Sequence, residues 1–223
     1  MAPRLERLIT HFPRILSRLM HLIDILKSLS RKEPGPQPTF REFEFIDFLL
    51  ILDKEGLIGR KRLSEYLGVG EGVVRTMIQR LRSQSLIEVS GRGGCKLSER
   101  GIEVVEQLKK LLRNVGPLDL ELPWDYPNNY VLIVKGASGK IRRGLEQRDE
   151  AIKAGAKALM ILTYTNNRLL MPGVSDLSSE KPDFAENIIK LLKPEEGDVI
   201  LIAAGSSVLE ARKGALAAAQ TLL

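Results

Sequence analysis

Apolar residues recur at helical spacing in two short stretches of the first half of the chain. The positions within each stretch lie three or four residues apart, which places them on one face of a helix. Gly68 and Gly70 separate the stretches and supply the backbone freedom of a tight turn. The pattern predicts a helix-turn-helix whose second helix covers residues 71–83. The two apolar faces consist of Leu63, Tyr66 and Leu67, and of Val74, Ile78 and Leu81.

A β-hairpin is predicted directly after the second helix. Residues 86–89 and 95–97 favour strands, and the glycine-rich segment between them forms a wing over residues 90–95. Arg92 stands between glycines at the tip, where it has little to pack against. A phosphate or the minor groove of DNA would suit its charge.

The polar side chains of the second helix are candidates for reading DNA. If the aliphatic face is buried, Arg75, Thr76 and Gln79 point outward into a major groove. Arg can bind guanine with two hydrogen bonds, and Gln can bind adenine in the same way. Basic residues nearby would contact the phosphate backbone. These predicted backbone contacts are Arg60, Lys61, Arg80, Arg82, Arg92 and Lys96.

These motifs resemble the winged helix-turn-helix superfamily of transcriptional regulators. The resemblance covers residues 40–112 and rests on Leu63-Ser-x-x-Leu67, Val74-Arg75-x-x-Ile78-x-x-Leu81 and Leu86-Ile87. Many relatives place Ser or Thr at the start of the second helix, where this chain has Gly70-Glu71-Gly72. Glu71 suits the positive end of the helix dipole but would repel a phosphate. A backbone-amide contact to phosphate is therefore not expected at that end.

The first 39 residues form a basic, amphipathic segment followed by a linker. Leucine and isoleucine recur at helical spacing over residues 3–30, and Pro13 is expected to kink or divide this helix. The segment fits a dimerisation arm, a packing helix or a membrane-surface helix, and packing or dimerisation is favoured because leucine stripes are usually buried against protein. Three prolines in the linker, residues 31–39, forbid a helix there.

Strands and helices alternate in the second half of the chain. From residue 130 the predicted order is βαββαβα, which favours an α+β chain with a two-layer, ferredoxin-like sandwich and an added C-terminal helix. A small α/β sheet of another strand order is the alternative. Residues 114–129 are rich in Pro and Asn and are expected to be a second linker. The predicted domains are thus 1–39, 40–113, 114–129 and 130–223.

Two loops of this half could bind a small anionic effector. Both lie between a strand and a helix, and backbone amides at the start of a helix attract anions. The alternative, which we favour, is that their glycines and serines only form turns and helix caps. The loops would share a ligand only if the strands before them are parallel. The candidate effector-binding residues are Lys135, Ser138, Lys140, Ser206 and Ser207.

Charge is distributed unevenly along the chain. Residues 1–116 contain 21 Lys and Arg against 14 Asp and Glu, whereas residues 117–223 contain 13 against 14. The basic half is the half with the predicted helix-turn-helix, as expected of a nucleic-acid-binding domain. A single cysteine excludes an intrachain disulfide and fits the cytoplasm, and no apolar run is long enough to span a membrane. We find no catalytic constellation, cofactor motif or metal-ligand set, so an enzyme is not expected.

Over its full length the chain resembles an uncharacterised archaeal family that joins an N-terminal winged helix to a C-terminal domain of unknown function. The segments that carry this resemblance are Lys135-Gly-Ala, Glu146-Gln-Arg-Asp-Glu-Ala-Ile-Lys-Ala-Gly155 and Met171-Pro-Gly-Val-Ser175. The resemblance implies a transcriptional regulator and adds no catalytic residues. The sequence therefore predicts a homodimeric regulator that binds double-stranded DNA. The alternatives are a winged helix that docks an acidic protein and, last, an enzyme with an anion site at residues 136–140.

Overall fold

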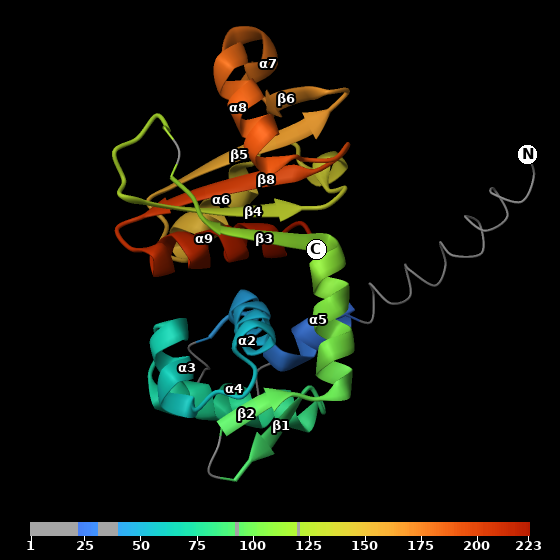
Figure 1. Cartoon of the computed structure of the whole chain (residues 1–223), viewed down its shortest axis with the longest axis vertical. Helices are drawn as coiled ribbons and strands as arrows, with labels where there is room; N and C mark the ends of the chain where they lie inside the picture. The colour runs from blue at the N-terminus through green and yellow to red at the C-terminus, as the bar shows by residue number, and fades with distance from the viewer. Residues whose placement is uncertain (1–21, 31–39, 92–93, 120) are drawn as a thin grey trace, which may run out of the picture. The chain divides into compact units, whose positions relative to one another are not determined.

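The chain divides into two compact units, Met1–Leu108 and Lys109–Leu223, which we call the N-terminal and C-terminal units. In the computed structural model shown in Figure 1, residues 22–30, 40–91, 94–119 and 121–223 are described. The predicted linker at 31–39 and most of the N-terminal amphipathic segment lie outside these ranges. The two units are described in turn.

The N-terminal unit is built from helices around one aromatic and aliphatic core. Apolar residues at helical spacing between Glu42 and Glu55, followed by Gly56, predict a helix with these bounds, and α2 (Glu42–Glu55) has them. The side chain of Glu44 accepts the backbone N–H of Arg41 at 2.7 Å. Gly56 ends the helix with φ at 71°, a conformation that favours glycine. The core consists chiefly of Phe45, Phe48, Leu49, Leu63, Leu67, Val74, Met77, Leu81 and Leu86.

The helix-turn-helix and the wing are both present. α3 (Arg60–Leu67) packs against α4 (Glu71–Ser83), and β1 (Ile87–Ser90) pairs with β2 (Gly94–Leu97) in antiparallel register. Leu57 and Ile58 are apolar and predict a short strand beside the hairpin, and Ile58 adds an isolated bridge to Cys95. Ser98 caps α5 (Glu99–Leu111) by accepting a backbone N–H at 3.0 Å.

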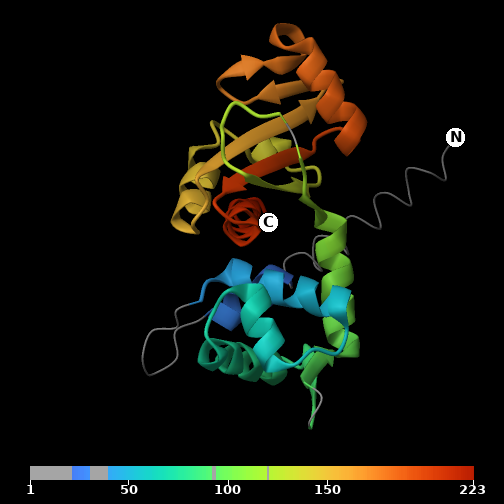
Figure 2. The ribbon, with the colours of Figure 1, turned by 60° about the vertical axis from the view of Figure 1, so that its left-hand side comes forward.

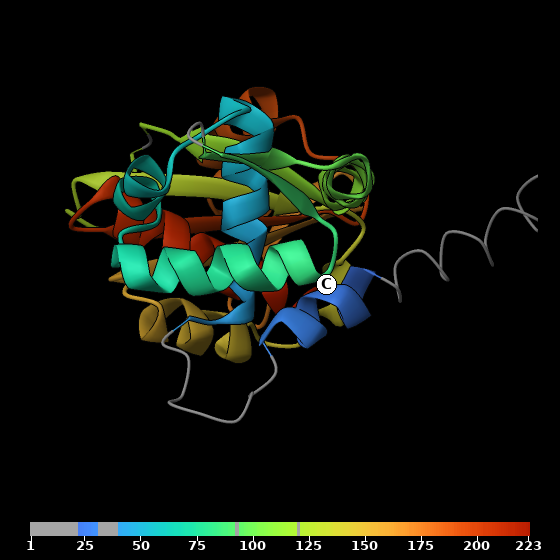
Figure 3. The ribbon, with the colours of Figure 1, turned by 90° about the horizontal axis from the view of Figure 1, so that it is seen from below.

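Residues 22–30 form a helix that packs within the N-terminal unit. Its apolar residues, Leu22, Ile25, Leu26 and Leu29, are all buried. Figure 3 shows this helix in blue beside one end of α4. This part of the amphipathic segment therefore serves packing; residues 1–21 lie outside the described part of the chain.

The C-terminal unit contains a six-stranded sheet in which every neighbouring pair is antiparallel. In spatial order the strands are β3 (Leu112–Pro117), β4 (Asn128–Val134), β8 (Val199–Gly205), β5 (Ala158–Thr165), β6 (Arg168–Met171) and β7 (Ser175–Asp176). Asn166-Asn167 between two apolar stretches predicts a hairpin turn, and this turn joins β5 to β6 with both residues at positive φ.

Helices cover both faces of this sheet, as Figures 1 and 2 show. α6 (Leu145–Lys153) and α9 (Val208–Gln220) pack on one face. α8 (Pro182–Leu192) packs on the other, together with the short α7 (Leu177–Glu180). Val131 and Ile133 on β4 face α8, so the residues between them face α9. A short 3-10 helix, η1 (Ser138–Lys140), follows β4.

The α+β class is confirmed, but the prediction of a two-layer ferredoxin-like sandwich is wrong, both in the number of layers and in the strand order. β8 lies between β4 and β5 and is antiparallel to both. All seven of its residues are buried, and such a run needs cover on both faces and a central place in the sheet. β3 is a further correction, because it begins at Leu112, where the sequence pattern predicted a helix end and a linker.

Candidate nucleic-acid interface

The turn between α3 and α4 sets the direction of the candidate recognition helix. Gly68 ends α3 in the left-handed conformation, with φ at 59°, and Gly70 is the N-cap of α4. Leu63 and Leu67 from α3 are fully buried, as are Val74 and Leu81 from α4. The two helices are thus fixed by one shared core, and the opposite face of α4 is left to solvent.

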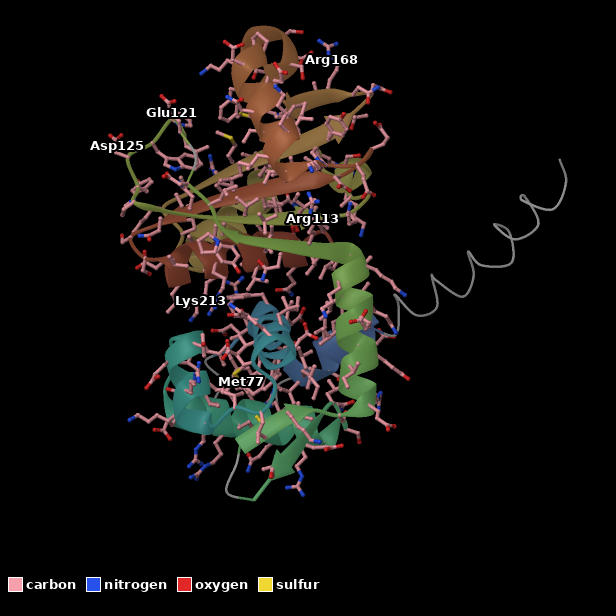
Figure 4. The ribbon with its side chains drawn as sticks, viewed as in Figure 1. Met77, Arg113, Glu121, Asp125, Arg168 and Lys213 are labelled. Atoms are coloured by element: carbon pink, nitrogen blue, oxygen red, sulfur yellow. The ribbon has the colours of Figure 1, made fainter. Side chains whose placement is uncertain are left out.

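The buried face of α4 is rotated from the one the pattern predicted. It consists of Val74, Met77 and Leu81, whereas Ile78 is only half-buried. Met77 lies inside the N-terminal unit in Figure 4. The spacing of four apolar residues allowed either rotation, and packing selected the one that buries methionine.

Three predicted DNA contacts share the exposed face of α4. Arg75, Gln79 and Arg82 are spaced by four and three residues and are all exposed. Thr76 is half-buried, and its hydroxyl donates to the carbonyl of Gly72 at 3.2 Å, within its own helix. The exposed side chains are long donors that can reach base edges or phosphates.

Arg80 differs from its predicted role as a backbone contact. It is only 9% exposed, and its guanidinium donates to the carbonyl of Leu29 at 2.6 Å. The guanidinium carbon lies 4.9 Å from the centroid of the Phe40 ring. Because the rotation of α4 turns Arg80 inward, this residue fastens the 22–30 helix to α4 and cannot meet a phosphate.

The basic residues at the start of α3 are accessible. Lys61 is exposed, and Arg60 forms an ion pair with Glu71 at 3.5 Å, with 45% and 52% of the two side chains exposed. Glu71, which the sequence suggested would repel phosphate, is therefore partly neutralised. An exposed ion pair of this kind contributes at most about 1 kcal/mol, so Arg60 can exchange its partner.

The wing is anchored at its base by the main chain of Ile58. The backbone groups of Ile58 and Cys95 bond to each other at 3.0 and 3.1 Å. A Cβ added to Gly94 would lie 2.1 Å from the carbonyl oxygen of Ile58, so this close approach requires glycine. On the wing, Lys96 forms an exposed ion pair with Glu88 at 3.0 Å. Arg92 lies outside the described residues.

Cys95 is buried beneath the wing and is a structural residue. Burial raises the pKa of its thiol to about 11. The thiol therefore stays protonated at neutral pH, which makes it a poor nucleophile and a poor metal ligand.

The five candidate effector-binding residues do not form one site. β4 and β8 are antiparallel, with Val134 opposite Val199 and Asn128 opposite Gly205. The loop that follows β4 and the loop that follows β8 therefore lie at opposite ends of the strand pair. The first loop holds Lys135, Ser138 and Lys140, and the second holds Ser206 and Ser207.

Each of these loops has a structural role. Asp198 is 1% exposed and accepts hydrogen bonds from the ammonium of Lys135 at 3.2 Å and the backbone N–H of Gly136 at 3.2 Å. Burial lowers the pKa of Lys135, but hydrogen bonds to Glu195 and Asp198 raise it by more. Lys140 donates to the carbonyl of Leu222 at 2.7 Å. These contacts occupy the lysines that were candidates for holding an anion.

The second loop caps a helix, as in the favoured alternative. The hydroxyl of Ser207 accepts the backbone N–H of Glu210 at 3.2 Å. In return, the carboxylate of Glu210 accepts the backbone N–H of Ser206 at 2.9 Å. This reciprocal pair of hydrogen bonds satisfies two backbone N–H groups at the start of α9 without a ligand.

A cavity in the C-terminal unit was missed by sequence reasoning. It lies between the loop that joins β3 to β4 and helices α7 and α8, and its volume is about 580 Å³. Its residues come from segments far apart in sequence, and the apolar ones belong to ordinary core patterns. The only signal was Trp124 in a supposed linker, which packs against the core and donates to Asn129 at 3.0 Å.

Within the part of the chain that the structure describes, no group of three or more His, Cys, Asp and Glu side chains could hold a metal ion. Among the same residues, no helix is long and apolar enough to cross a membrane.

Comparison with known proteins finds a match in each half of the chain. Residues 47–112 match the family described as the CggR N-terminal DNA binding domain, and residues 127–222 match a domain of unknown function, DUF4443. The chain thus joins a winged helix-turn-helix region to a region that matches DUF4443. These matches confirm the resemblance to winged helix-turn-helix transcriptional regulators that was seen in the sequence.

Two similar proteins support this assignment. The Central glycolytic genes regulator of Bacillus subtilis (strain 168) is 31% identical over 80 residues, which are 36% of this chain and 22% of that regulator. The chain thus matches about a fifth of the length of this relative. Hypothetical protein PH0730 from Pyrococcus horikoshii OT3 is similar in structure, with a TM-score of 0.62 and 29% identity over 81% of this chain and 91% of that one.

Proposed function

We propose that this winged helix-turn-helix protein regulates transcription by placing α4 in the major groove of double-stranded DNA. The observation that carries the proposal is the exposed row of Arg75, Gln79 and Arg82 on α4. These side chains are long, polar and turned away from the core, and they match the donors that read base edges and phosphates. Thr76 lies beside them and would contact a base edge or a thymine methyl group.

Charges around α4 would bind the DNA backbone. Arg60 and Lys61 start α3, and Lys96 lies on the wing. Arg60 and Lys96 are held by exposed ion pairs to Glu71 and Glu88, which phosphates can replace at small cost. Arg92, which the sequence predicts at the tip of the wing, would be a further contact to the backbone or the minor groove.

Two copies of the chain would bind one operator. A single recognition helix contacts too few base pairs for useful affinity, and dimers read two half-sites about one helical turn apart. We assign dimerisation or the control of DNA binding to the DUF4443 domain. This role makes the chain a regulator rather than an enzyme.

The salt dependence of binding to a duplex tests this function. Affinity for a fluorescent 30-base-pair duplex, a length that holds two such half-sites, is measured by anisotropy over a range of salt concentrations. Each neutralised phosphate contributes about −0.9 to the slope of log K against log salt, so four or five contacts from each of the two copies give a slope near −8. Arg82→Ala removes one contact from each copy and should reduce the magnitude of the slope by about two. The matched control, Arg148→Ala, removes an exposed arginine from α6 and should leave the slope unchanged.

A protein-docking winged helix predicts a different result. Such a module would show little affinity for the duplex even at low salt. That outcome, or an equal change of slope in Arg82→Ala and Arg148→Ala, would refute the assignment of α4 to DNA.

A further inference from the structure

The cavity in the C-terminal unit has an apolar floor. Met160, Leu177 and Ile188 are buried at its base, and the half-buried Met171 and Phe184 form its walls. Its volume of about 580 Å³ is within the usual range of small-molecule sites, about 300–1,000 Å³. Two methionines give such a lining the ability to adapt to an apolar ligand.

The rim of the cavity is polar and mostly acidic. Asp119 and Glu121 come from the loop between β3 and β4, whereas Asp183 and Lys181 come from the start of α8. All four are exposed, and within the described residues their side chains make no hydrogen bond or ion pair. Three carboxylates against one ammonium leave the rim with a net negative charge, and every one of these groups is available to a ligand.

Two residues of the loop that carries part of the rim, one on each side of Glu121 in the sequence, bond to Asn129. The backbone N–H of Leu118 donates to the carbonyl of Asn129 at 3.3 Å, and the indole of Trp124 donates to the side chain of the same residue at 3.0 Å. Figure 4 labels Glu121 and Asp125 on this loop. Because the loop is anchored, the acidic rim is held over the apolar floor before a ligand arrives, which reduces the entropic cost of binding.

We propose that this cavity binds a small organic cation, a molecule with an alkyl or aryl body and a protonated amine. The apolar body would lie on the floor between Met160 and Phe184. The ammonium would face the carboxylates of Glu121 and Asp183 at the rim. The sign of this charge is opposite to that of the anionic effector considered for the loops after β4 and β8. The inference concerns the C-terminal unit alone and stands or falls independently of DNA binding.

Matched aryl compounds test the proposal on the full chain. The protein is labelled at its methionine methyl groups with ¹³C and titrated with 2-phenylethylamine, 2-phenylethanol and 3-phenylpropanoate. The amine should shift the Met160 and Met171 signals in a saturable way, and the carboxylate should not. Met77 is buried in the N-terminal unit and serves as an internal control that should not shift.

Charge-neutralising variants identify the rim. The double variant combines Glu121→Gln with Asp183→Asn. Both of these side chains are exposed, so the variant should fold. Each exposed ion pair is worth up to about fivefold in affinity, and losing two should weaken amine binding about tenfold. Binding of the neutral alcohol should not change. Asp125→Asn alters an exposed carboxylate of the same loop that does not line the cavity, and it is expected to behave as wild type.

Three results would overturn the proposal. The first is an absence of saturable shifts at Met160 and Met171. The second is equal binding of the amine and the carboxylate. The third is unchanged amine affinity in the double variant.

Discussion

Replacing Arg80 by Met separates the structural role of this residue from a role in DNA binding. The variant keeps most of the side-chain volume but removes the charge and the hydrogen bond to Leu29. A hydrogen bond from a charged group contributes about 1.5–3 kcal/mol, and a desolvated contact with an aromatic ring such as Phe40 adds about 2 kcal/mol. The variant no longer has to desolvate a guanidinium, which offsets part of this loss. We expect the N-terminal unit to lose about 2 kcal/mol of stability.

Urea denaturation with two probes measures this loss. Trp124 is the single tryptophan of the chain and reports on the C-terminal unit, whereas far-UV circular dichroism also follows the helices of the N-terminal unit. With a slope of about 1–1.5 kcal/mol per molar urea, the circular dichroism midpoint of the N-terminal unit should fall by about 1.5 M. The tryptophan midpoint should not move.

The matched control is Arg75→Met, which removes an exposed arginine from the same helix. It should change stability by less than about 0.5 kcal/mol but should weaken binding to DNA. Arg80→Met should keep the wild-type salt slope under conditions in which it is folded. Unchanged stability together with a slope reduced in magnitude by about two, one contact for each copy, would show that Arg80 contacts phosphate and that its buried position is wrong.

Three further predictions concern stability. Gly101→Ala would place a Cβ 2.0 Å from the carbonyl oxygen of Leu86 and should cost at least about 2 kcal/mol of stability. Gly72 has open space around it, so Gly72→Ala should be neutral or stabilise α4 by about 0.5 kcal/mol. Thermal unfolding compares the two variants. Because its pKa is raised on folding, the protonated thiol of Cys95 contributes fully to stability below the unfolded pKa near 9.0, and this contribution is lost as pH rises through about 11. Alkylation of Cys95 in the folded protein should be slow until that pH range is reached. The raised pKa of Lys135 predicts that its contribution to the C-terminal unit is complete below 10.5 and is lost above it; Lys135→Met should abolish this alkaline loss in urea titrations followed by tryptophan fluorescence.

The elements with strong local signals were predictable from the sequence. α2 combines an apolar face with a glycine stop, and its bounds, Glu42–Glu55, were predicted correctly. The hairpin turn at Asn166 and Asn167 was equally clear, because asparagine tolerates the positive φ that such a turn requires. These features depend on residues that are close together in the chain.

The features that depend on distant partners could not be predicted. β3 contains Asn, Gly and Pro, which disfavour strands, and it is held at the sheet edge by pairing with β4 across a register shift. The rotation of α4 was ambiguous because Met77 and Ile78 are both apolar. Packing that includes Phe40 and the 22–30 helix decided it, and that packing is also what buried Arg80.

The order of strands in the C-terminal unit was undetermined for a similar reason. The element order βαββαβ is compatible with several strand orders in the sheet. No local sequence feature indicates that β8 lies between β4 and β5. The buried runs in β4 and β8 did contain one usable signal, since strands apolar on both faces require helices on both sides of the sheet. Helices on both sides of the sheet are incompatible with a two-layer sandwich.

Selection of bound fragments from sheared genomic DNA tests the central claim most directly. The full chain should recover a limited set of fragments that share a sequence repeated at half-site spacing. Arg75→Ala combined with Gln79→Ala should recover a different or unselected set, because these side chains are assigned to base edges. Recovery of the same fragments by this variant, or a random sample of the genome with the wild-type protein, would contradict the account.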